Sequence, residues 1–136
     1  MDIRIYYEDT DCGGVVYYAN YLKYFERART DFFRERGVDI ALLSQEGTLF
    51  VVSKAEVSYK YPAAYNDIIS VETQLARLKG ASFNLDYAIT RKSDSKLLVT
   101  GTTLMAAVDS SRKPLKITGS LKEKFNSILC STVPSP

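Results

Sequence analysis

The chain contains no histidine, and this absence narrows the chemistry that it can carry out. Histidine is the commonest general base near neutral pH, a member of the usual catalytic triads and a frequent zinc ligand. Acid–base or nucleophilic work must therefore fall to carboxylates, tyrosines, lysines or cysteine. Since the usual set of histidine and cysteine ligands is missing, we expect no metal site and no redox cofactor.

Cysteine is scarce as well: Cys12 and Cys130 are far apart in the sequence and form no CxxC pair. This usage is typical of a reducing compartment, although a bridge between the two stays open from sequence alone. The amino-terminal residues show no positive region followed by an apolar run, and no stretch approaches about 18 consecutive apolar residues. We therefore expect no signal peptide, no integral membrane segment and a cytoplasmic location.

The chain also lacks a large excess of charge of either sign. Its net charge is only +2, which gives no argument for a nucleic-acid partner. The chain has 136 residues, of which 46% are hydrophobic and 25% are charged. These values are typical of one globular domain that buries its own core. We expect a single domain over residues 1–130, followed by a frayed tail at residues 131–136.

Hydrophobic periodicity predicts a strand followed by a long helix in the first part of the chain. Residues 2–8 alternate with a period of two, which is typical of a strand with one buried face. Apolar side chains then recur at helical spacing from Tyr18 to Phe32, and Gly37 follows in a position suited to a C-terminal cap. Residues 38–48 are predicted to form a loop or a short helical turn.

The second part of the chain predicts four more strands, at residues 51–59, 69–75, 83–89 and 97–108. The last of these is apolar or small on both faces, so we expect it to be covered on both sides and more central than the others. A short C-terminal helix is predicted at residues 120–129. One long helix against an antiparallel sheet is an α+β layer arrangement.

Candidate chemistry lies where the first strand stops and the helix begins, in the turn from Asp9 to Gly14. Asp9 and Asp11 either cap the turn through backbone hydrogen bonds, or one of them acts as a carboxylate beside a helix N-terminus. Free N–H groups at a helix start can hold a developing oxyanion, and the two glycines allow close approach of the backbone. Cys12 is disfavoured as a nucleophile, because no histidine is present to activate its thiol.

The residues around this turn form a longer pattern, which comprises Arg4-Ile5, Thr10-Asp11, Gly14-Val15-Val16-Tyr17 and Ala19-Asn20-Tyr21. This pattern resembles the signature of the 4-hydroxybenzoyl-CoA thioesterase family of hotdog-fold proteins. The segments YYEDTD, ANYLKYFERAR and V-x-Y-x-Y-P-A-x-Y-N-D are most similar to the YbgC-type acyl-CoA thioesterases associated with the Tol–Pal operon. The resemblance extends over essentially the whole chain. It implies a hotdog fold, in which a five-stranded antiparallel sheet wraps a long central helix.

The resemblance also implies an activity, the hydrolysis of an acyl thioester to a free acid and CoA. Asp11 matches the aspartate that serves such enzymes as nucleophile or general base, and both roles stay open. The backbone N–H of Tyr18 matches the helix-start amide that polarises the thioester carbonyl. Tyr17, Asn20 and Tyr21 are expected to form the wall beside the reacting carbon.

Related enzymes place this site between two subunits. One helix cannot hide the edge strands of a five-stranded sheet, so we expect a homo-oligomer, either a dimer or a tetramer. The second wall of the site is expected from the neighbouring chain, around Val51 to Ala55, with Val51, Val52 and Ser53 as the candidate contacts.

The family further implies a place for the CoA phosphates, which basic side chains hold near the turn into the fourth strand. The matching residues here are Arg77, Lys79 and Ser82. Two solvated charges at a hairpin are the alternative explanation for Arg77 and Lys79. Coenzyme A is then part of the substrate rather than a cofactor.

One position departs from the YbgC-type pattern, because those proteins usually have a histidine where this chain has Tyr18. The role of the backbone amide survives any side chain, so the change bears on substrate choice more than on catalysis. The acyl group stays open between a short or medium aliphatic chain, on CoA or on acyl carrier protein, and an aromatic group such as hydroxybenzoyl or dihydroxynaphthoyl. A non-catalytic subunit that binds acyl thioesters or acts as a scaffold is the alternative function. A dehydratase on the same fold is disfavoured, because such enzymes generally rely on histidine.

Overall fold

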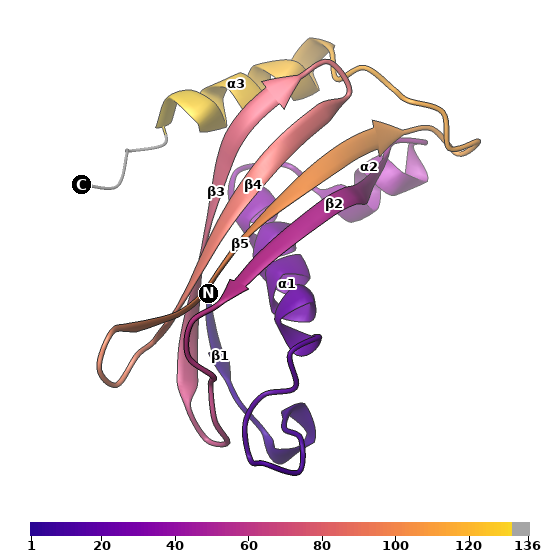
Figure 1. The fold of residues 1–136 in the computed structure, drawn as a ribbon. Coiled ribbons are helices and arrows are strands. Elements are labelled where there is room, and N and C mark those ends of the chain that lie inside the picture. The colour runs from indigo at the N-terminus through magenta and orange to yellow at the C-terminus, as the bar shows by residue number, and fades with distance from the viewer. Residues whose placement is uncertain (132–136) are drawn as a thin grey trace.

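A computed structural model describes residues 1–131 of the chain. The elements are β1 (Asp2–Arg4), the 3-10 helix η1 (Tyr7–Asp9), α1 (Asn20–Glu35), α2 (Ile40–Gln45), β2 (Leu49–Tyr59), β3 (Ile68–Lys79), β4 (Ser82–Arg91), β5 (Lys96–Val108) and α3 (Gly119–Ser131). The strands form one antiparallel sheet in the order β1-β3-β4-β5-β2. Figure 1 shows α1 lying along one face of this sheet, with α3 at the upper end of β3. The predicted α+β hotdog fold, a long helix wrapped by a five-stranded antiparallel sheet, is confirmed.

The first strand is shorter than its alternating pattern predicted. Residues 2–8 were expected to be extended, but β1 ends at Arg4 and the chain then turns into η1. The carboxylate of Asp9 stabilises this turn, because its Oδ2 accepts a hydrogen bond from the Tyr6 N–H at 2.8 Å. The turn-capping role is therefore confirmed for Asp9, and the strand prediction is wrong beyond Arg4.

Helix α1 begins at Asn20, two residues later than predicted, because Tyr18 and Ala19 form a turn before it. It ends as expected at a glycine cap. Gly37 has φ of 81° and donates its N–H to the Arg34 carbonyl at 3.2 Å, while the Val38 N–H reaches the Phe33 carbonyl at 2.8 Å. These two bonds form a Schellman motif, which satisfies carbonyls at the helix end.

The aromatic stripe of α1 packs against the sheet at one close approach. Its buried side chains are Tyr21, Tyr24, Phe25, Ala28, Phe32 and Phe33. The ring of Phe25 stacks on that of Tyr87 in β4, with 4.3 Å between centroids. A Cβ atom on Gly101 of β5 would lie 2.5 Å from the Phe25 ring, closer than any real contact allows. The absence of a side chain at Gly101 thus lets the helix lie this near the sheet.

The expectation that residues 97–108 form the most central strand, covered on both faces, is wrong. The middle strand is β4, and β5 lies between β4 and β2. Val99 and Met105 of β5 are buried, whereas Thr100 and Thr102 remain partly exposed in this single chain. The strand lacks alternation because polar or small residues such as Gly101 and the buried Thr103 occupy its helix-facing side, while Thr100 and Thr102 lie on its outer side.

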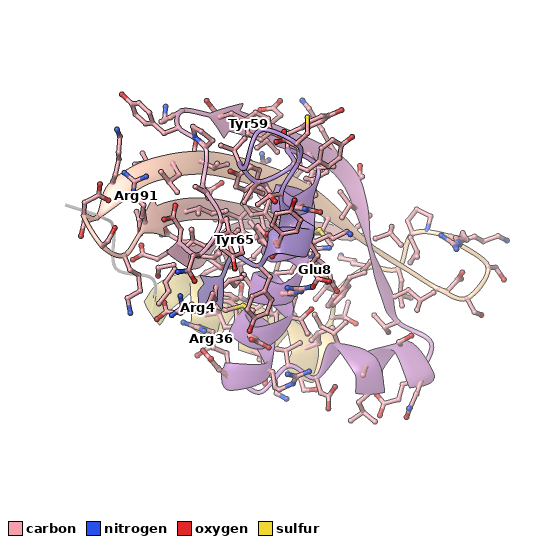
Figure 2. All side chains as sticks on the ribbon, turned by 90° about the horizontal axis from the view of Figure 1, so that it is seen from below. Arg4, Glu8, Arg36, Tyr59, Tyr65 and Arg91 are labelled. Atoms are coloured by element: carbon pink, nitrogen blue, oxygen red, sulfur yellow. The ribbon has the colours of Figure 1, made fainter. Side chains whose placement is uncertain are left out.

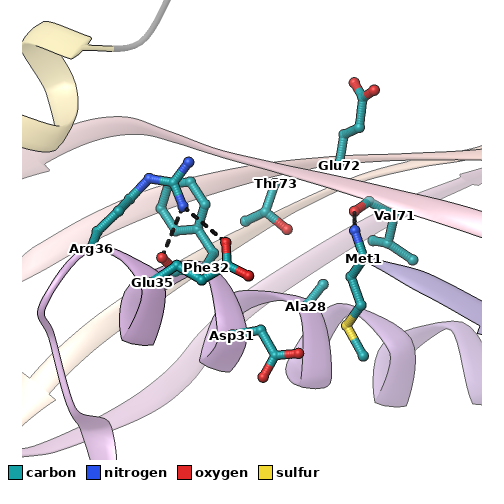
Figure 3. Close-up of a pocket in the computed structure, with 9 residues that line it drawn as sticks. All are labelled: Met1, Ala28, Asp31, Phe32, Glu35, Arg36, Val71, Glu72 and Thr73. Carbon is teal, nitrogen blue, oxygen red and sulfur yellow. Dashed lines mark hydrogen bonds and ion pairs between the residues drawn. The ribbon is translucent and has the colours of Figure 1, made fainter.

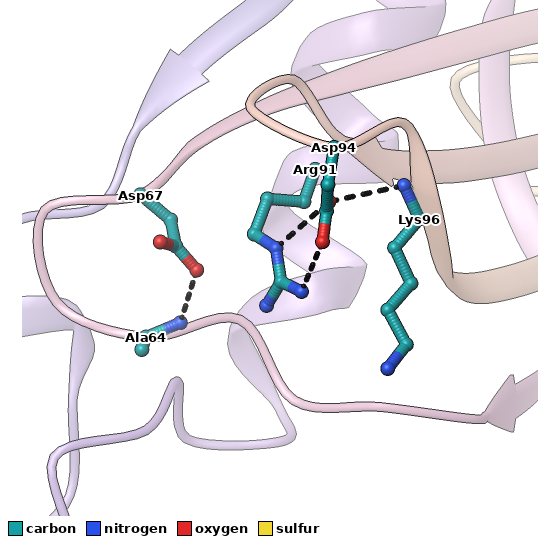
Figure 4. A network of polar contacts seen from close by, with 5 residues as sticks. All are labelled: Ala64, Asp67, Arg91, Asp94 and Lys96. Carbon is teal, nitrogen blue, oxygen red and sulfur yellow. Dashed lines mark hydrogen bonds and ion pairs between the residues drawn. The ribbon is translucent and has the colours of Figure 1, made fainter.

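The loops near the lower end of the sheet are fixed by carboxylates (Figure 4). Arg91 and Asp94 form a bidentate ion pair in the β4–β5 hairpin, with distances of 3.0 Å from Nε to Oδ1 and 2.7 Å from Nη2 to Oδ2. The bonds from Arg91, together with one from the Lys96 N–H, lower the pKa of Asp94 to about 2. In the β2–β3 loop, Asp67 Oδ2 accepts the Ala64 N–H at 2.9 Å.

The remaining helices follow the predictions closely. The short turn expected at residues 38–48 contains α2, and α3 covers the helix predicted at residues 120–129. Ser131 was predicted to begin a frayed tail but is the last residue of α3, and residues 132–136 lie outside the described part of the chain. Within residues 1–131, none of the helices combines the length and apolar character needed to cross a membrane.

Candidate active site

Residues 9–17 form a narrow hairpin that holds Asp11 beside the start of α1. Thr10 and Val16 make an antiparallel bridge, and the Asp11 N–H donates to the Val15 carbonyl at 2.9 Å. Gly14, at φ of 80°, closes the tip and donates its N–H to the Asp11 carbonyl at 3.1 Å. Glycine adopts this left-handed conformation at little cost, so the Asp11 backbone is fixed by local geometry.

The carboxylate of Asp11 is exposed, and its two oxygens differ in their surroundings. Oδ1 accepts a hydrogen bond from the Gly13 N–H at 2.8 Å, so this oxygen caps the turn. Oδ2 makes no hydrogen bond or ion pair with any of residues 1–131. One oxygen orients the group, and the other is open to a reacting molecule.

The peptide N–H of Tyr18 is also open. The N–H of Tyr17 donates to the Asp9 carbonyl at 3.0 Å, and the Asn20 N–H donates to the Tyr17 carbonyl at 2.9 Å. Between these two bonded groups, the Tyr18 N–H has no acceptor among the residues that the structure describes. Tyr18 lies in the turn immediately before α1, so its N–H is near the positive end of the helix dipole. The arrangement can therefore stabilise an oxyanion.

The polar groups of Asn20 and Tyr21 are used inside the protein. The Asn20 side-chain Nδ2 donates to the Asp9 carbonyl at 2.9 Å and so fastens η1 to α1. The Tyr21 hydroxyl accepts the Ala63 N–H at 3.0 Å, and burial raises the pKa of this phenol. Asn20 thus positions the turn, whereas the ring of Tyr21 does line a cleft, as described below.

The β2–β3 loop is bound to the hairpin by two backbone hydrogen bonds. The Val16 N–H donates to the Ala63 carbonyl at 2.8 Å, and the Tyr65 N–H donates to the Gly14 carbonyl at 3.2 Å. Tyr65 and Tyr59 are labelled in Figure 2, which views the molecule from the end that carries this hairpin. The Asp11 turn is therefore supported by a segment about 50 residues away in the sequence, which periodicity could not reveal.

An apolar cleft of about 210 Å³ opens beside Tyr18. It is lined by Val16, Tyr18, Tyr21, Tyr59, Lys60, Tyr61 and Pro62. The Tyr59 hydroxyl donates to the Tyr18 carbonyl at 3.3 Å, and the two rings meet edge to face. Sequence reasoning did not select Tyr59 or Tyr61, although both belong to the motif V-x-Y-x-Y-P.

Tyr17 lies next to this cleft without lining it. Its ring is 47% exposed and lies 4.9 Å from the Tyr18 ring. The two phenols interact, which raises the pKa of Tyr17. The predicted wall of Tyr17, Asn20 and Tyr21 is therefore divided: one residue is exposed beside the site, one holds the turn and one lines the cleft.

The predicted second wall lies far from Asp11 in the single chain. Val51, Val52 and Ser53 are near the start of β2, whereas Tyr59 at its end contacts Tyr18. Tyr59 is six positions after Ser53 along the strand, a distance of about 20 Å. Val52 and Ser53 are exposed, and a bulge leaves Ser53 out of register with β5.

The predicted phosphate-binding residues also lie away from Asp11. Arg77, Lys79 and Ser82 belong to the β3–β4 hairpin, at the end of the sheet opposite the Asp11 turn (Figure 1). Arg77 and Lys79 are exposed and make no ion pair within residues 1–131. The Ser82 hydroxyl donates to the Lys79 carbonyl at 3.0 Å and so closes the hairpin.

Other candidate chemistry is sparse. Cys12 and Cys130 are exposed free thiols, so the structure contains no bridge between them. Among the described residues, no group of three or more histidine, cysteine, aspartate or glutamate side chains could hold a metal ion.

A second cavity, of about 300 Å³, lies between the later turns of α1 and β3 (Figure 3). The Arg36 guanidinium lies 3.8 Å from the centre of the Phe32 ring, donates to the Phe32 carbonyl at 3.0 Å and pairs with Glu35 at 3.7 Å. The Arg36 guanidinium is therefore already bound by its neighbours, and the Met1 ammonium donates to the Val71 carbonyl at 3.1 Å. No residue of the Asp11 turn lines this cavity.

Comparison with known proteins identifies the family. Residues 6–125 match the sequence profile of the thioesterase-like superfamily. The acyl-CoA thioesterase YbgC of Haemophilus influenzae is 36% identical over 126 residues, which cover 91% of each chain. The acyl-CoA thioester hydrolase YbgC of Escherichia coli O6:H1 is 36% identical over 124 residues, which cover 90% of this chain and 92% of that protein.

Solved structures agree with this result. A probable thioesterase from Bartonella henselae superposes with a TM-score of 0.81 and 33% identity, over 87% of this chain and 97% of that one. The DHNA-CoA thioesterase of Staphylococcus aureus superposes with a TM-score of 0.90 and 25% identity, over 96% and 89% of the two chains. The chain belongs to the hotdog-fold thioesterase-like superfamily, is closely similar to its YbgC-type members, and is a thioester hydrolase.

Proposed function

We propose that the protein hydrolyses acyl-CoA thioesters, with Asp11 as nucleophile or general base and the Tyr18 N–H as the group that polarises the thioester carbonyl. One observation carries this proposal: a single hairpin presents a free carboxylate oxygen and joins directly to a helix-start N–H without an internal acceptor. The relatives named acyl-CoA thioesterases support CoA as the carrier.

In the nucleophilic route, Asp11 Oδ2 attacks the thioester carbon and the carbonyl oxygen becomes an oxyanion. The Tyr18 N–H donates a hydrogen bond to that oxyanion, where its energetic effect is largest. Collapse breaks the C–S bond and releases CoA as a thiolate, which then takes a proton from solvent. The mixed anhydride that remains is hydrolysed by water, which regenerates the Asp11 carboxylate.

In the general-base route, Asp11 Oδ2 takes a proton from water while the water oxygen attacks the thioester carbon. The same N–H stabilises the oxyanion, so both routes use the same two groups. Heavy oxygen from labelled water enters the Asp11 carboxylate when water attacks the anhydride at the Asp11 carbonyl carbon, and its detection there by mass spectrometry would identify the anhydride route.

The site is completed in our proposal by a second copy of the chain. Strand β2 is a sheet edge with an exposed Val52, and exposed edges favour strand pairing. An antiparallel pairing of two β2 strands centred on Glu56 would place Ser53 of one copy opposite Tyr59 of the other. This brings the predicted second wall, at Val51 to Ser53, to the cleft beside Tyr18.

The exposed Arg77 and Lys79 are our candidates for binding the CoA phosphates, since guanidinium and ammonium groups bind phosphate well. Ser82 stays a candidate contact beside them. We place the reaction in the cytoplasm, which two free thiols favour.

The test is a hydrolysis screen over aliphatic and aromatic acyl-CoAs and acyl carrier protein thioesters, in which released thiol is measured. The proposal predicts turnover of at least one acyl-CoA, and light scattering that gives at least twice the chain mass of 15.3 kDa. Binding of acyl-CoA with no hydrolysis above background would instead support the alternative, a non-catalytic binding or scaffold subunit.

A further inference from the structure

The cleft beside Tyr18 is small, and its size bears on the substrate. Its volume is about 210 Å³, and apolar groups form most of its surface. An apolar protein cavity of about 150 Å³ is enough to bind benzene. Pockets for drug-sized ligands span about 300–1,000 Å³. In the single chain, the space between the residues that line the cleft therefore accommodates one six-membered ring with a small substituent, or a chain of a few carbons.

One wall of the cleft is Tyr59, and several contacts hold its ring in place. The hydroxyl donates to the Tyr18 carbonyl at 3.3 Å. The ring centroid lies 6.4 Å from that of Tyr18, with the rings at 90°, and 5.6 Å from that of Tyr21. Tyr21 is itself anchored by its bond to the Ala63 N–H. Such edge-to-face and tilted ring contacts are favourable and directional, so this wall resists displacement.

Tyr61 also lines the cleft, and its ring contacts Lys96, which is not among the lining residues. The Lys96 ammonium lies 3.5 Å from the centre of the Tyr61 ring, an attractive cation–π arrangement. Lys96 belongs to the start of β5, so the ring is tied to an inner strand. A longer acyl chain would have to displace Tyr59 or Tyr61, and both have contacts that oppose this.

We infer that Tyr59 is a specificity-determining residue, which limits the acyl group in this cleft to about the size of one six-membered ring. The inference rests on the proposed function, because it takes the Tyr18 N–H as the place of the thioester carbonyl. We place the acyl group in this cleft because Tyr18 both lines it and carries the N–H that has no acceptor among the described residues.

The experiment compares kcat/KM for benzoyl-CoA and dodecanoyl-CoA. The wild-type protein is expected to prefer benzoyl-CoA by at least about tenfold, since steric fit in an apolar pocket is worth about 10–200-fold per misplaced methylene. Tyr59→Ala opens the cleft and is expected to reduce this preference at least about tenfold. Tyr59→Phe keeps the ring and is expected to retain the preference within about threefold.

Two further variants complete the design. Leu42→Ala removes a comparably exposed apolar side chain on α2, outside the cleft and away from the Asp11 turn, and is expected to leave the preference unchanged. Tyr61→Ala removes another ring that lines the cleft and repeats the test if Tyr59→Ala does not fold. The inference is overturned by wild-type preference for dodecanoyl-CoA, or by an unchanged preference in the opened variants.

A binding measurement separates this inference from the proposed function. Calorimetry with Asp11→Asn, which is expected to bind without turnover, compares the affinities for benzoyl-CoA and dodecanoyl-CoA before and after Tyr59→Ala is added. A loss of size preference on adding Tyr59→Ala supports the inference even if the wild-type protein hydrolyses nothing. Turnover with no size preference overturns the inference and leaves the proposed function standing.

Discussion

The Tyr59 hydroxyl, at the end of β2, donates a hydrogen bond to the Tyr18 carbonyl at the start of α1. This bond joins the exposed edge of the sheet to the turn that carries the free N–H of Tyr18. It also fixes the peptide that follows Tyr18 while leaving the preceding N–H open. One hydrogen bond therefore connects the edge strand β2 and the cleft to the turn that carries the proposed oxyanion donor.

Replacing the peptide bond between Tyr17 and Tyr18 by an ester removes the N–H and keeps every side chain. We expect kcat to fall about 10²–10³-fold, the effect of losing one oxyanion donor. KM should change little, because the donor acts mainly on the transition state. Tyr18→Phe keeps the N–H and should stay within about threefold of wild-type kcat. An ester variant with wild-type turnover would remove the amide from the mechanism.

Asn20→Ala removes the bond from Nδ2 to the Asp9 carbonyl, which fastens η1 to α1. We expect kcat to fall about three- to tenfold, the scale of one hydrogen bond, because the Tyr18 N–H is then less well positioned. KM for short acyl-CoAs should stay within about twofold. Asn84→Ala, on the outer side of β4, serves as the control. A rise in KM with unchanged kcat would instead show that Asn20 contacts substrate.

Gly101→Ala tests the close approach of α1 to the sheet. The new methyl group would meet the Phe25 ring at 2.5 Å, so the ring or the helix must move. We expect the unfolding free energy to fall by about 1–3 kcal/mol, the usual cost of overpacking, in a urea titration. Thr100→Ala, one residue away on the outer face, should change it by less than about 1 kcal/mol. Equal effects of the two variants would contradict this account.

Buried phenols predict a loss of stability in alkali. Burial and the nearby Asp9 carboxylate raise the pKa of Tyr24, and burial raises the pKa of Tyr21 and Tyr87. The folded chain therefore keeps these protons when the unfolded chain releases them. The unfolding free energy should be insensitive to this effect below about pH 10 and fall as the pH rises above it.

Tyr24→Phe isolates one of these phenols. Its hydroxyl is buried without a hydrogen-bond partner among the described residues, so its removal should raise the unfolding free energy at pH 7 by about 1 kcal/mol. The decline of stability between pH 10 and 11 should become shallower than in the wild-type protein. Tyr65→Phe, at an exposed phenol, provides the control for both measurements. A steeper decline in Tyr24→Phe would refute the assignment.

The fold was predictable because its signals are local. Alternating residues gave the four long strands, and the helical stripe with Gly37 gave α1 and its end. The alternating pattern wrongly predicted a strand at residues 5–8. There the Asp9 carboxylate accepts a hydrogen bond from the Tyr6 N–H and stabilises a turn instead. The pattern also failed to order β4 and β5, because small residues on β5 reflect packing against Phe25 rather than a central place.

Only the part of the site that lies in one continuous segment of the chain was predictable from the sequence. Asp11 and Tyr18 belong to one continuous motif, so the sequence places them together. Tyr59 and Tyr61 reach the cleft through pairing of distant strands, and the Asn20 bond depends on the unforeseen η1 turn. Val51 to Ser53 and the Arg77 hairpin lie away from Asp11 within one chain, so their roles depend on a second copy.

The most direct test of the central claim is the turnover of Asp11→Asn on the best acyl-CoA substrate of the wild-type protein. The change keeps the size of the side chain and an oxygen that can accept the Gly13 N–H, so the thermal midpoint should stay within a few degrees. Our account predicts that kcat falls at least about 10²-fold, because the nucleophile or general base is lost. Turnover by a folded Asp11→Asn at close to the wild-type rate would contradict it.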